Sequence, residues 1–173
     1  MKKLLLFVSV LALTLTGCED NETPNTVLTS EIKVDGVSFN PTRNGLNTYF
    51  VEGNSEVADR RFFTLIKGSG ENISQAIYVN LDLWDGRSNE GGSYIFHIGE
   101  VGTNLFANGM YLEGDVSYQL AGGTVHVTQM TDGYYKLVFE NVQAVNVFSQ
   151  TQQEKLITGE FKAKFNVINV PVE

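Results

Sequence analysis

Apolar and polar residues alternate with a period of two along much of this chain, and the clearest instance covers residues 156–167. Because successive side chains of a β-strand point to opposite faces of a sheet, this alternation predicts a strand with one buried and one solvated face. The apolar face would carry Ile157, Phe161, Ala163, Phe165 and Val167. Residues 76–83 alternate in the same way, and no segment shows a convincing helical period.

Glycine-containing turns separate the predicted strands. The dipeptide Asp35-Gly36 lies between two alternating segments, which is the signature of a two-residue β-hairpin. Two later turns, at residues 121–123 and 131–133, divide the second half of the chain into a predicted meander of four strands. The run after the second of these turns is long for one strand, so a bulge or bend is expected near Asn141.

Two further segments, residues 62–66 and 94–98, are apolar on both faces, as expected for strands covered on either side. About nine strands without a convincing helix predict an all-β fold, a single antiparallel β-sandwich, with a meander β-barrel as the alternative. Connections too short for parallel crossovers favour the antiparallel arrangement. No second linker or repeat divides residues 31–173, which are therefore expected to form one β domain.

Residues 1–17 have the pattern of a secretory signal peptide. A positive start is followed by the mostly apolar run 4–15, which is shorter than the about 20 residues that a membrane-spanning helix needs. The next junction, residues 15–18 (LTGC), resembles the lipobox of bacterial lipoproteins. That resemblance implies cleavage before Cys18 and its acylation, which would anchor the mature chain to a membrane. The alternative is an ordinary signal peptide followed by an incidental cysteine.

Residues 18–30 are expected to be the lipidated cysteine and a flexible acidic tether, because they are polar and lack apolar periodicity. The cluster Glu19, Asp20 and Glu22 resembles the export signal of surface-displayed lipoproteins in Bacteroidota. This resemblance implies an outer-membrane protein whose domain faces the outside of the cell. If the cluster is only a solvated linker, the domain would face the periplasm.

The charge of the chain argues against one class of partner. The formal net charge is −8, and removal of Lys2 and Lys3 with the signal peptide leaves ten basic against twenty acidic side chains. Such a surface repels phosphate backbones and anionic lipids, so no nucleic-acid partner is expected. Contact with the membrane would depend on the acyl chains of Cys18.

No catalytic residues are apparent in the sequence. Nucleophilic catalysis needs a nucleophile, a base and an orienting group within hydrogen-bond reach, and only His97 and His126 could supply an imidazole base. His97 lies in an apolar segment and is expected in the core. His126 alternates with two valines and is expected to face solvent.

One polar stretch could bind a cation. Ca²⁺ prefers six to eight oxygen ligands, and Asp82, Asp85, Asn89 and Glu90 offer carboxylate and amide oxygens within nine residues. Their spacing does not follow an EF-hand loop, and Arg87 places a positive charge among them. The simpler interpretation is a polar connection between strands. The sequence therefore requires no cofactor, and Ca²⁺ is the one cofactor that this stretch could bind.

Several aromatic residues stand near predicted strand ends or on outward positions. Trp84, Tyr134 and Tyr135 are the candidate ligand-binding residues, because exposed rings can stack on sugars or contact a protein. Aromatic residues are also common in ordinary strands, which is the alternative interpretation.

The chain as a whole resembles the small lipoproteins of unknown function found in Bacteroidota. The resemblance is carried by the lipobox with its acidic tail and by three segments, IKVDGVSF at 32–39, GGSYIF at 91–96 and LITGEFKAKF at 156–165. It implies a cell-envelope location and a β fold, and it transfers no catalytic residues.

These observations predict a lipid-anchored protein of the cell envelope that is not an enzyme. Its β domain would be a binding or interaction module for a glycan or a protein partner. The alternatives are a structural or assembly lipoprotein of the envelope, and a β-barrel that holds a small apolar ligand.

Overall fold

A computed structural model describes residues 27–51, 59–69, 71–83, 91–98, 106–149 and 153–172. These residues form strands almost throughout, with a single 3-10 turn at Thr131–Gly133, so the predicted all-β fold is confirmed. No helix among them is long and apolar enough to span a membrane. The strands are β1 (Val27–Ser30), β2 (Lys33–Val34), β3 (Val37–Ser38), β4 (Arg43–Val51), β5 (Asp59–Ser69), β6 (Asn72–Leu83), β7 (Gly92–Phe96), β8 (Phe106–Glu113), β9 (Val116–Gln129), β10 (Tyr134–Val145), β11 (Glu154–Lys164) and β12 (Val167–Val172).

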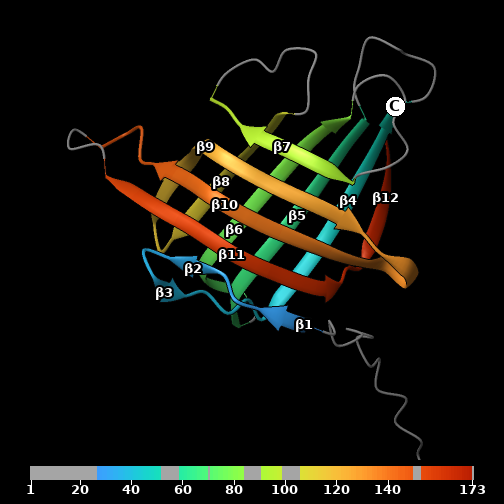
Figure 1. Ribbon diagram of the computed structural model, residues 1–173, viewed down its shortest axis with the longest axis horizontal. Coiled ribbons are helices and arrows are strands. Elements are labelled where there is room, and N and C mark those ends of the chain that lie inside the picture. The colour runs from blue at the N-terminus through green and yellow to red at the C-terminus, as the bar shows by residue number, and fades with distance from the viewer. Residues whose placement is uncertain are drawn as a thin grey trace, which may run out of the picture.

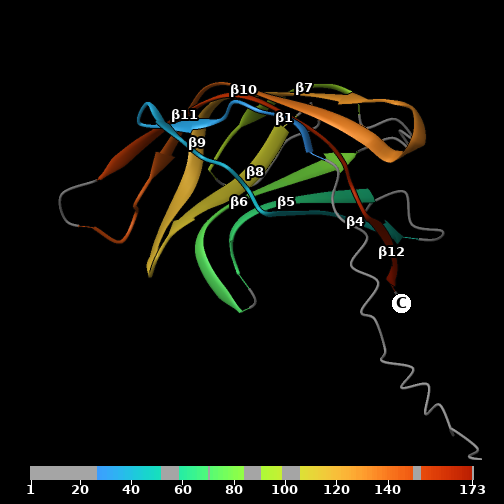
Figure 2. The same ribbon diagram turned by 90° about the horizontal axis from the view of Figure 1, so that it is seen from below.

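All strands belong to one continuous sheet with the order β12-β4-β5-β6-β8-β7-β9-β10-β11-β2-β3, and β1 adds to β11. The sheet curls into a half-barrel, so that β4–β6 lie across from β9–β11 (Figures 1 and 2). The two layers expected of a sandwich are thus the two halves of a single curled sheet. Most neighbours are antiparallel as predicted, but β7 runs parallel to β8, and β12 runs parallel to β4.

The predicted four-strand meander is present as β8, β9, β10 and β11, each antiparallel to the next. Its first turn was placed wrongly by the sequence pattern, because β9 continues through Gly122 and Gly123 and the chain turns instead at Gly114-Asp115. The glycine pair bends β9 rather than ending it. A bent strand of 14 residues can belong to both halves of the curled sheet.

Two local predictions are confirmed. Asp35 and Gly36 both have positive φ, 51° and 77°, and join β2 to β3 in a tight hairpin. On β10 the pairing with β11 skips between Phe139 and Val142, and Asn141 in between has φ of 50°. This is the bulge expected near Asn141.

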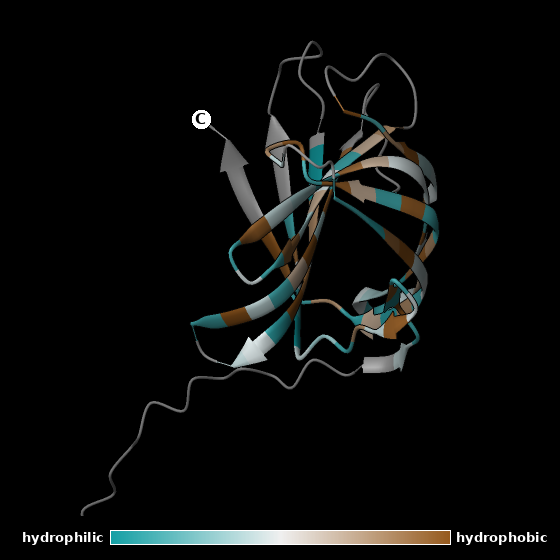
Figure 3. Ribbon diagram, turned by 90° about the vertical axis from the view of Figure 1, so that its left-hand side faces the viewer, coloured by the Kyte–Doolittle hydropathy of each residue, from teal (hydrophilic) through white to brown (hydrophobic). Residues whose placement is uncertain are grey.

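The core lies inside the curl, and the alternation of the strands decides which residues enter it. Figure 3 shows hydrophobic and hydrophilic bands alternating along the strands. On β11 and just after it, the predicted inward residues are buried, whereas Val167 begins β12 and is 41% exposed. Aromatic rings fill the interior: Phe63, Phe161 and Phe165 are almost fully buried and meet edge to face around Phe165.

A polar cluster joins strands that are distant in the sheet, and we call it the clasp. It consists of Asp35, Gln75, Tyr111, Glu113 and Lys155. Lys155 Nζ lies 3.2 Å from Asp35 Oδ2 and 3.2 Å from Glu113 Oε2. The Tyr111 hydroxyl donates to Glu113 Oε1 at 3.1 Å and accepts from Gln75 at 2.7 Å. The clasp therefore links β6 and β8 to the β2–β3 hairpin and β11.

The clasp shifts the titration of its members. Burial opposes charge on Glu113, but Lys155 and the hydrogen bonds from Tyr111 and Gln75 outweigh it and lower the pKa of Glu113. The backbone N–H of Leu156, with help from Lys155, outweighs desolvation and lowers the pKa of Asp35. Hydrogen bonds to Glu113 and Asp35 raise the pKa of Lys155.

Acid is expected to weaken the clasp. Folding lowers the pKa values of Glu113 and Asp35. The two carboxylates therefore stabilise the fold fully at a pH above their ordinary pKa values, and this stabilisation is lost as the pH falls through the lowered pKa values. These groups are partly exposed, so Lys155→Ala should lower the free energy of unfolding at pH 7 by only about 1 kcal/mol. Urea unfolding should show this loss shrinking toward pH 3. A loss equal at both pH values, or equal to that of the exposed control Lys33→Ala, would contradict the linkage.

Candidate functional site

Strand β7 forms a fork with its neighbours, and the fork is the candidate site. Strands β8 and β9 pair with each other through residues 110–113 and 116–119. Farther along they diverge, and β7 enters between them, pairing with β9 through residues 92–95 and with β8 through Ile95 and Phe96. The chain leaves β7 at His97, whose backbone N–H still donates to the carbonyl of Ala107 at 3.2 Å.

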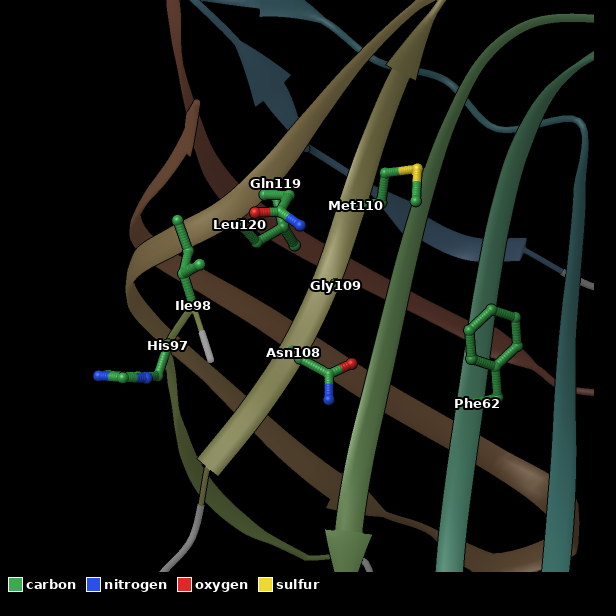
Figure 4. A pocket seen from close by; sticks show the side chains of 8 residues that line it. All are labelled: Phe62, His97, Ile98, Asn108, Gly109, Met110, Gln119 and Leu120. Carbon is green, nitrogen blue, oxygen red and sulfur yellow. The ribbon is translucent and has the colours of Figure 1, made fainter. Parts of the chain in front are cut away.

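A hollow of about 350 Å³ lies at this fork (Figure 4). Its lining comes from β5, β8 and β9 and from the chain just after β7: Phe62, His97, Ile98, Asn108, Gly109, Met110, Gln119 and Leu120. Gly109 lies in the lining, and an added Cβ there would lie 2.3 Å from the Tyr78 carbonyl oxygen and 2.8 Å from Leu120 Cδ1. A residue without a side chain is therefore required where Leu120 packs against β8.

The hollow combines hydrogen-bonding side chains with flat apolar ones. The polar groups are the amides of Asn108 and Gln119, whereas the imidazole of His97, at the edge of the hollow, points away from them (Figure 4). Beside them the Phe62 ring stacks on Tyr78 from the next strand, with centroids 5.7 Å apart and planes 19° from parallel. Such a set can bind a neutral ligand that has hydroxyl groups and an apolar face.

The position of His97 corrects a sequence expectation. Its segment is apolar on both faces, which predicted a core histidine, but the residue is exposed at the edge of the hollow and its ring points outward (Figure 4). Its ring lies 5.9 Å from that of Phe106. The same correction applies to Ile95 and Ile98, which are 53% and 45% exposed. Within the part of the chain that the structure describes, no second layer therefore covers the outer face of β7, contrary to the sequence pattern.

Tyr134 and Tyr135, two of the predicted ligand-binding residues, have different environments. Tyr134 is half-buried at the start of β10. Tyr135 is 3% exposed, and its ring meets Phe63 and Phe165 edge to face at 5.4 and 5.7 Å. The outward placement expected for Tyr135 is thus wrong, because its pairing opposite Ala163 turns it into the core.

The other predicted site residues can be followed only in part. Cys18, Glu19, Asp20, Glu22, Trp84, Asp85, Asn89 and Glu90 lie outside the described residues. The backbone of Asp82 pairs with Arg60 near the end of β6. Within the described ranges no three His, Cys, Asp or Glu side chains are grouped to hold a metal ion. The predicted Ca²⁺ site therefore stays a prediction.

A row of hydrogen-bonded side chains crosses β7, β9 and β10 on the outer face of the sheet. Ser93 Oγ lies 2.7 Å from His126 Nδ1, and His126 Nε2 lies 3.0 Å from Glu140 Oε2. The His126 side chain is 39% exposed, in keeping with its predicted solvent-facing position. Sequence reasoning did not find Ser93 or Glu140, because no local pattern joins residues 33 and 14 positions away from the histidine.

Sequence reasoning also missed the residues of the hollow, because they come from separate strands and share no motif. The alternation on β5 and β6 places Phe62 and Tyr78 on the outward face, which was the one available signal. Comparison of the chain with protein-family models, with curated proteins and with solved structures finds no match to any of them.

Proposed function

We propose that this protein is an outer-membrane lipoprotein, anchored through acyl chains on Cys18, whose β domain binds a glycan at the fork. The lipobox-like residues 15–18 support the anchor, and the acidic Glu19, Asp20 and Glu22 support display of the domain outside the cell. The observation that carries the binding function is the hollow of about 350 Å³, whose lining includes two amides and apolar side chains.

The chemistry of the hollow favours a glycan over other ligands. The amides of Asn108 and Gln119 can each donate and accept, as sugar hydroxyls require, and the Phe62–Tyr78 pair offers an apolar ring face beside them. The volume is at the lower end of the range for small-molecule sites, which suits one or two sugar rings of a longer chain. The negative net charge favours neutral over anionic glycans.

Glycan binding is tested with the full mature chain carrying Cys18→Ala, titrated against neutral oligosaccharides by calorimetry. We expect Phe62→Ala or Asn108→Ala to weaken binding about tenfold, the effect of losing roughly 1.4 kcal/mol of contact. Phe148→Ala is the matched control, because Phe148 is 85% exposed and does not line the hollow. Equal affinity of the Phe62→Ala variant and this control, with unchanged melting curves, would reject the fork as the glycan site.

The anchor is tested in cells of the source organism or a lipoprotein-processing host. Cys18→Ala is expected to abolish incorporation of labelled palmitate and to move the protein from the detergent phase to the aqueous phase. Changing Glu19, Asp20 and Glu22 together to alanine should leave the label intact but protect the domain from protease added to whole cells. Palmitate label that persists without Cys18 would refute the anchor.

A protein partner is the second candidate. Apolar side chains surround the fork, with Ile95 at 53%, Ile98 at 45% and Met110 at 39% exposure, and such a rim suits a protein surface. Capture of a defined partner that is lost with Ile95→Asp would favour assembly over glycan binding. A small apolar ligand inside the curl has less support, because Phe63, Tyr135 and Phe165 already pack against one another there.

A further inference from the structure

The row Ser93–His126–Glu140 places a hydroxyl, an imidazole and a carboxylate in hydrogen-bonded sequence. The two contacts measure 2.7 Å from Ser93 Oγ to His126 Nδ1 and 3.0 Å from His126 Nε2 to Glu140 Oε2. A nucleophile, a base within hydrogen-bond reach and a third group that orients the base are the elements of an activated serine. Each residue of the row comes from a different strand, β7, β9 and β10.

Hydrogen-bonding capacity determines which nitrogen acts as the base. An ionised carboxylate only accepts hydrogen bonds, so Glu140 requires the proton of a neutral His126 to be on Nε2. That tautomer leaves the lone pair of Nδ1 free to accept the Ser93 hydroxyl proton. Glu140 is thus a positioning residue, and Nδ1 takes the role that Nε2 has in the serine-protease triad.

The backbone fixes this arrangement. Ser93 is directly opposite His126 in the pairing of β7 with β9, so their side chains share one face. Glu140 is opposite Thr124, one diagonal step from His126, and stands immediately before the bulge at Asn141. Bulges re-aim neighbouring side chains, and this one occurs where β10 presents its carboxylate to the imidazole.

We infer that Ser93 is an acyl-accepting nucleophile, with His126 as its general base. In the reaction, Ser93 Oγ forms a bond to the carbonyl carbon of an ester while His126 Nδ1 takes the hydroxyl proton. The C–O bond to the alcohol then breaks, and Nδ1 returns the proton to that alcohol. Water releases the acyl group as a carboxylic acid by the same two steps, so bonds and protons balance.

The setting of the row indicates the substrate class. Ser93 is exposed, and the side chains of His126 and Glu140 are 39% and 63% exposed on an open sheet face. Such a face suits a small acyl ester on an extended molecule that can lie across strands. Ser93 does not line the hollow, so the inference stands independently of glycan binding at the fork.

The test uses the mature chain with Cys18→Ala and a fluorophosphonate probe, which phosphonylates activated serines. We expect Ser93 to be the modified residue in peptide mass spectra, with a rate at least about 100-fold above that of Ser74. Ser74 is the matched control, because it is also exposed but its hydroxyl donates to the carbonyl of Lys67. Labelling of Ser93 at the rate of Ser74 would overturn the inference.

Two variants separate chemistry from folding. His126→Gln should slow Ser93 labelling about 100-fold, because the amide accepts a hydrogen bond but does not take up the proton. Glu140→Gln should slow it less, because it removes only the charge that holds the tautomer. Both variants should keep the wild-type melting temperature within a few degrees. Ser93 labelling unchanged in His126→Gln would overturn the inference, whatever glycan binding shows.

Discussion

Replacement of Phe63 by alanine is expected to lower the free energy of unfolding by about 4 kcal/mol, within the range for a fully buried phenylalanine. Phe63 is 0% exposed, and its ring meets Tyr135 at 5.4 Å and Phe165 at 5.3 Å, both edge to face. It comes from β5, whereas Tyr135 is on β10, so the contact joins the two halves of the curled sheet. The variant would leave a cavity where the halves meet.

Equilibrium unfolding in urea measures this loss as a shift in midpoint at constant slope. The control is Phe148→Ala, which removes the same side chain from a position that is 85% exposed and should change stability by less than about 0.5 kcal/mol. Similar midpoints for the two variants would show that the halves of the sheet are not held together through Phe63.

Replacement of Gly123 by alanine is expected to lower the free energy of unfolding by about 3 kcal/mol. Part of this loss comes from overpacking, and part from placing a side chain on a left-handed backbone. Gly123 has φ of +81°, and an added Cβ would lie 2.3 Å from the carbonyl oxygen of Asn141 and 2.6 Å from Cα of Val142. Both atoms are backbone, so no side-chain rotation relieves the clash. The bend of β9 and the bulge of β10 would have to separate.

Gly114→Ala is the control for the conformational part of this cost. Gly114 also has positive φ, +57°, but no atom lies within 4 Å of its added Cβ. Its replacement should therefore cost only about 1 kcal/mol. The free energies of unfolding of the two variants, measured by heat and by urea, should differ by about 2 kcal/mol. Equal free energies would refute the contact between β9 and the bulge.

Features that depend on neighbouring residues were predictable from the sequence. The alternation on β11 identified Ile157, Phe161 and Ala163 as core residues, because the direction of successive side chains is a local property of a strand. The Asp35-Gly36 turn was predictable because few residue pairs adopt two positive φ angles. The same local reasoning found the bulge at Asn141.

Errors arose where more than one arrangement satisfied the local pattern. Tyr134 and Tyr135 are adjacent aromatic residues, and only the register of β10 against β11 decides that Tyr135 faces inward. His97 belongs to an apolar segment. The outer face of that segment is exposed because nothing in the described sheet packs over the end of β7. A sandwich and a barrel can have the same number of strands and the same side-chain period. The sequence therefore did not decide how strongly the sheet curls.

The sequence alone therefore determined that the chain is a β protein, and it located the Asp35-Gly36 turn, the bulge near Asn141 and most of the apolar face of β11. Only the tertiary structure decided that β7 divides β8 from β9, that Phe62 and Asn108 line one hollow and that Ser93 meets His126 and Glu140. The physical reason is that side-chain alternation is set within each strand. Register and curl instead depend on pairing between residues far apart in the chain.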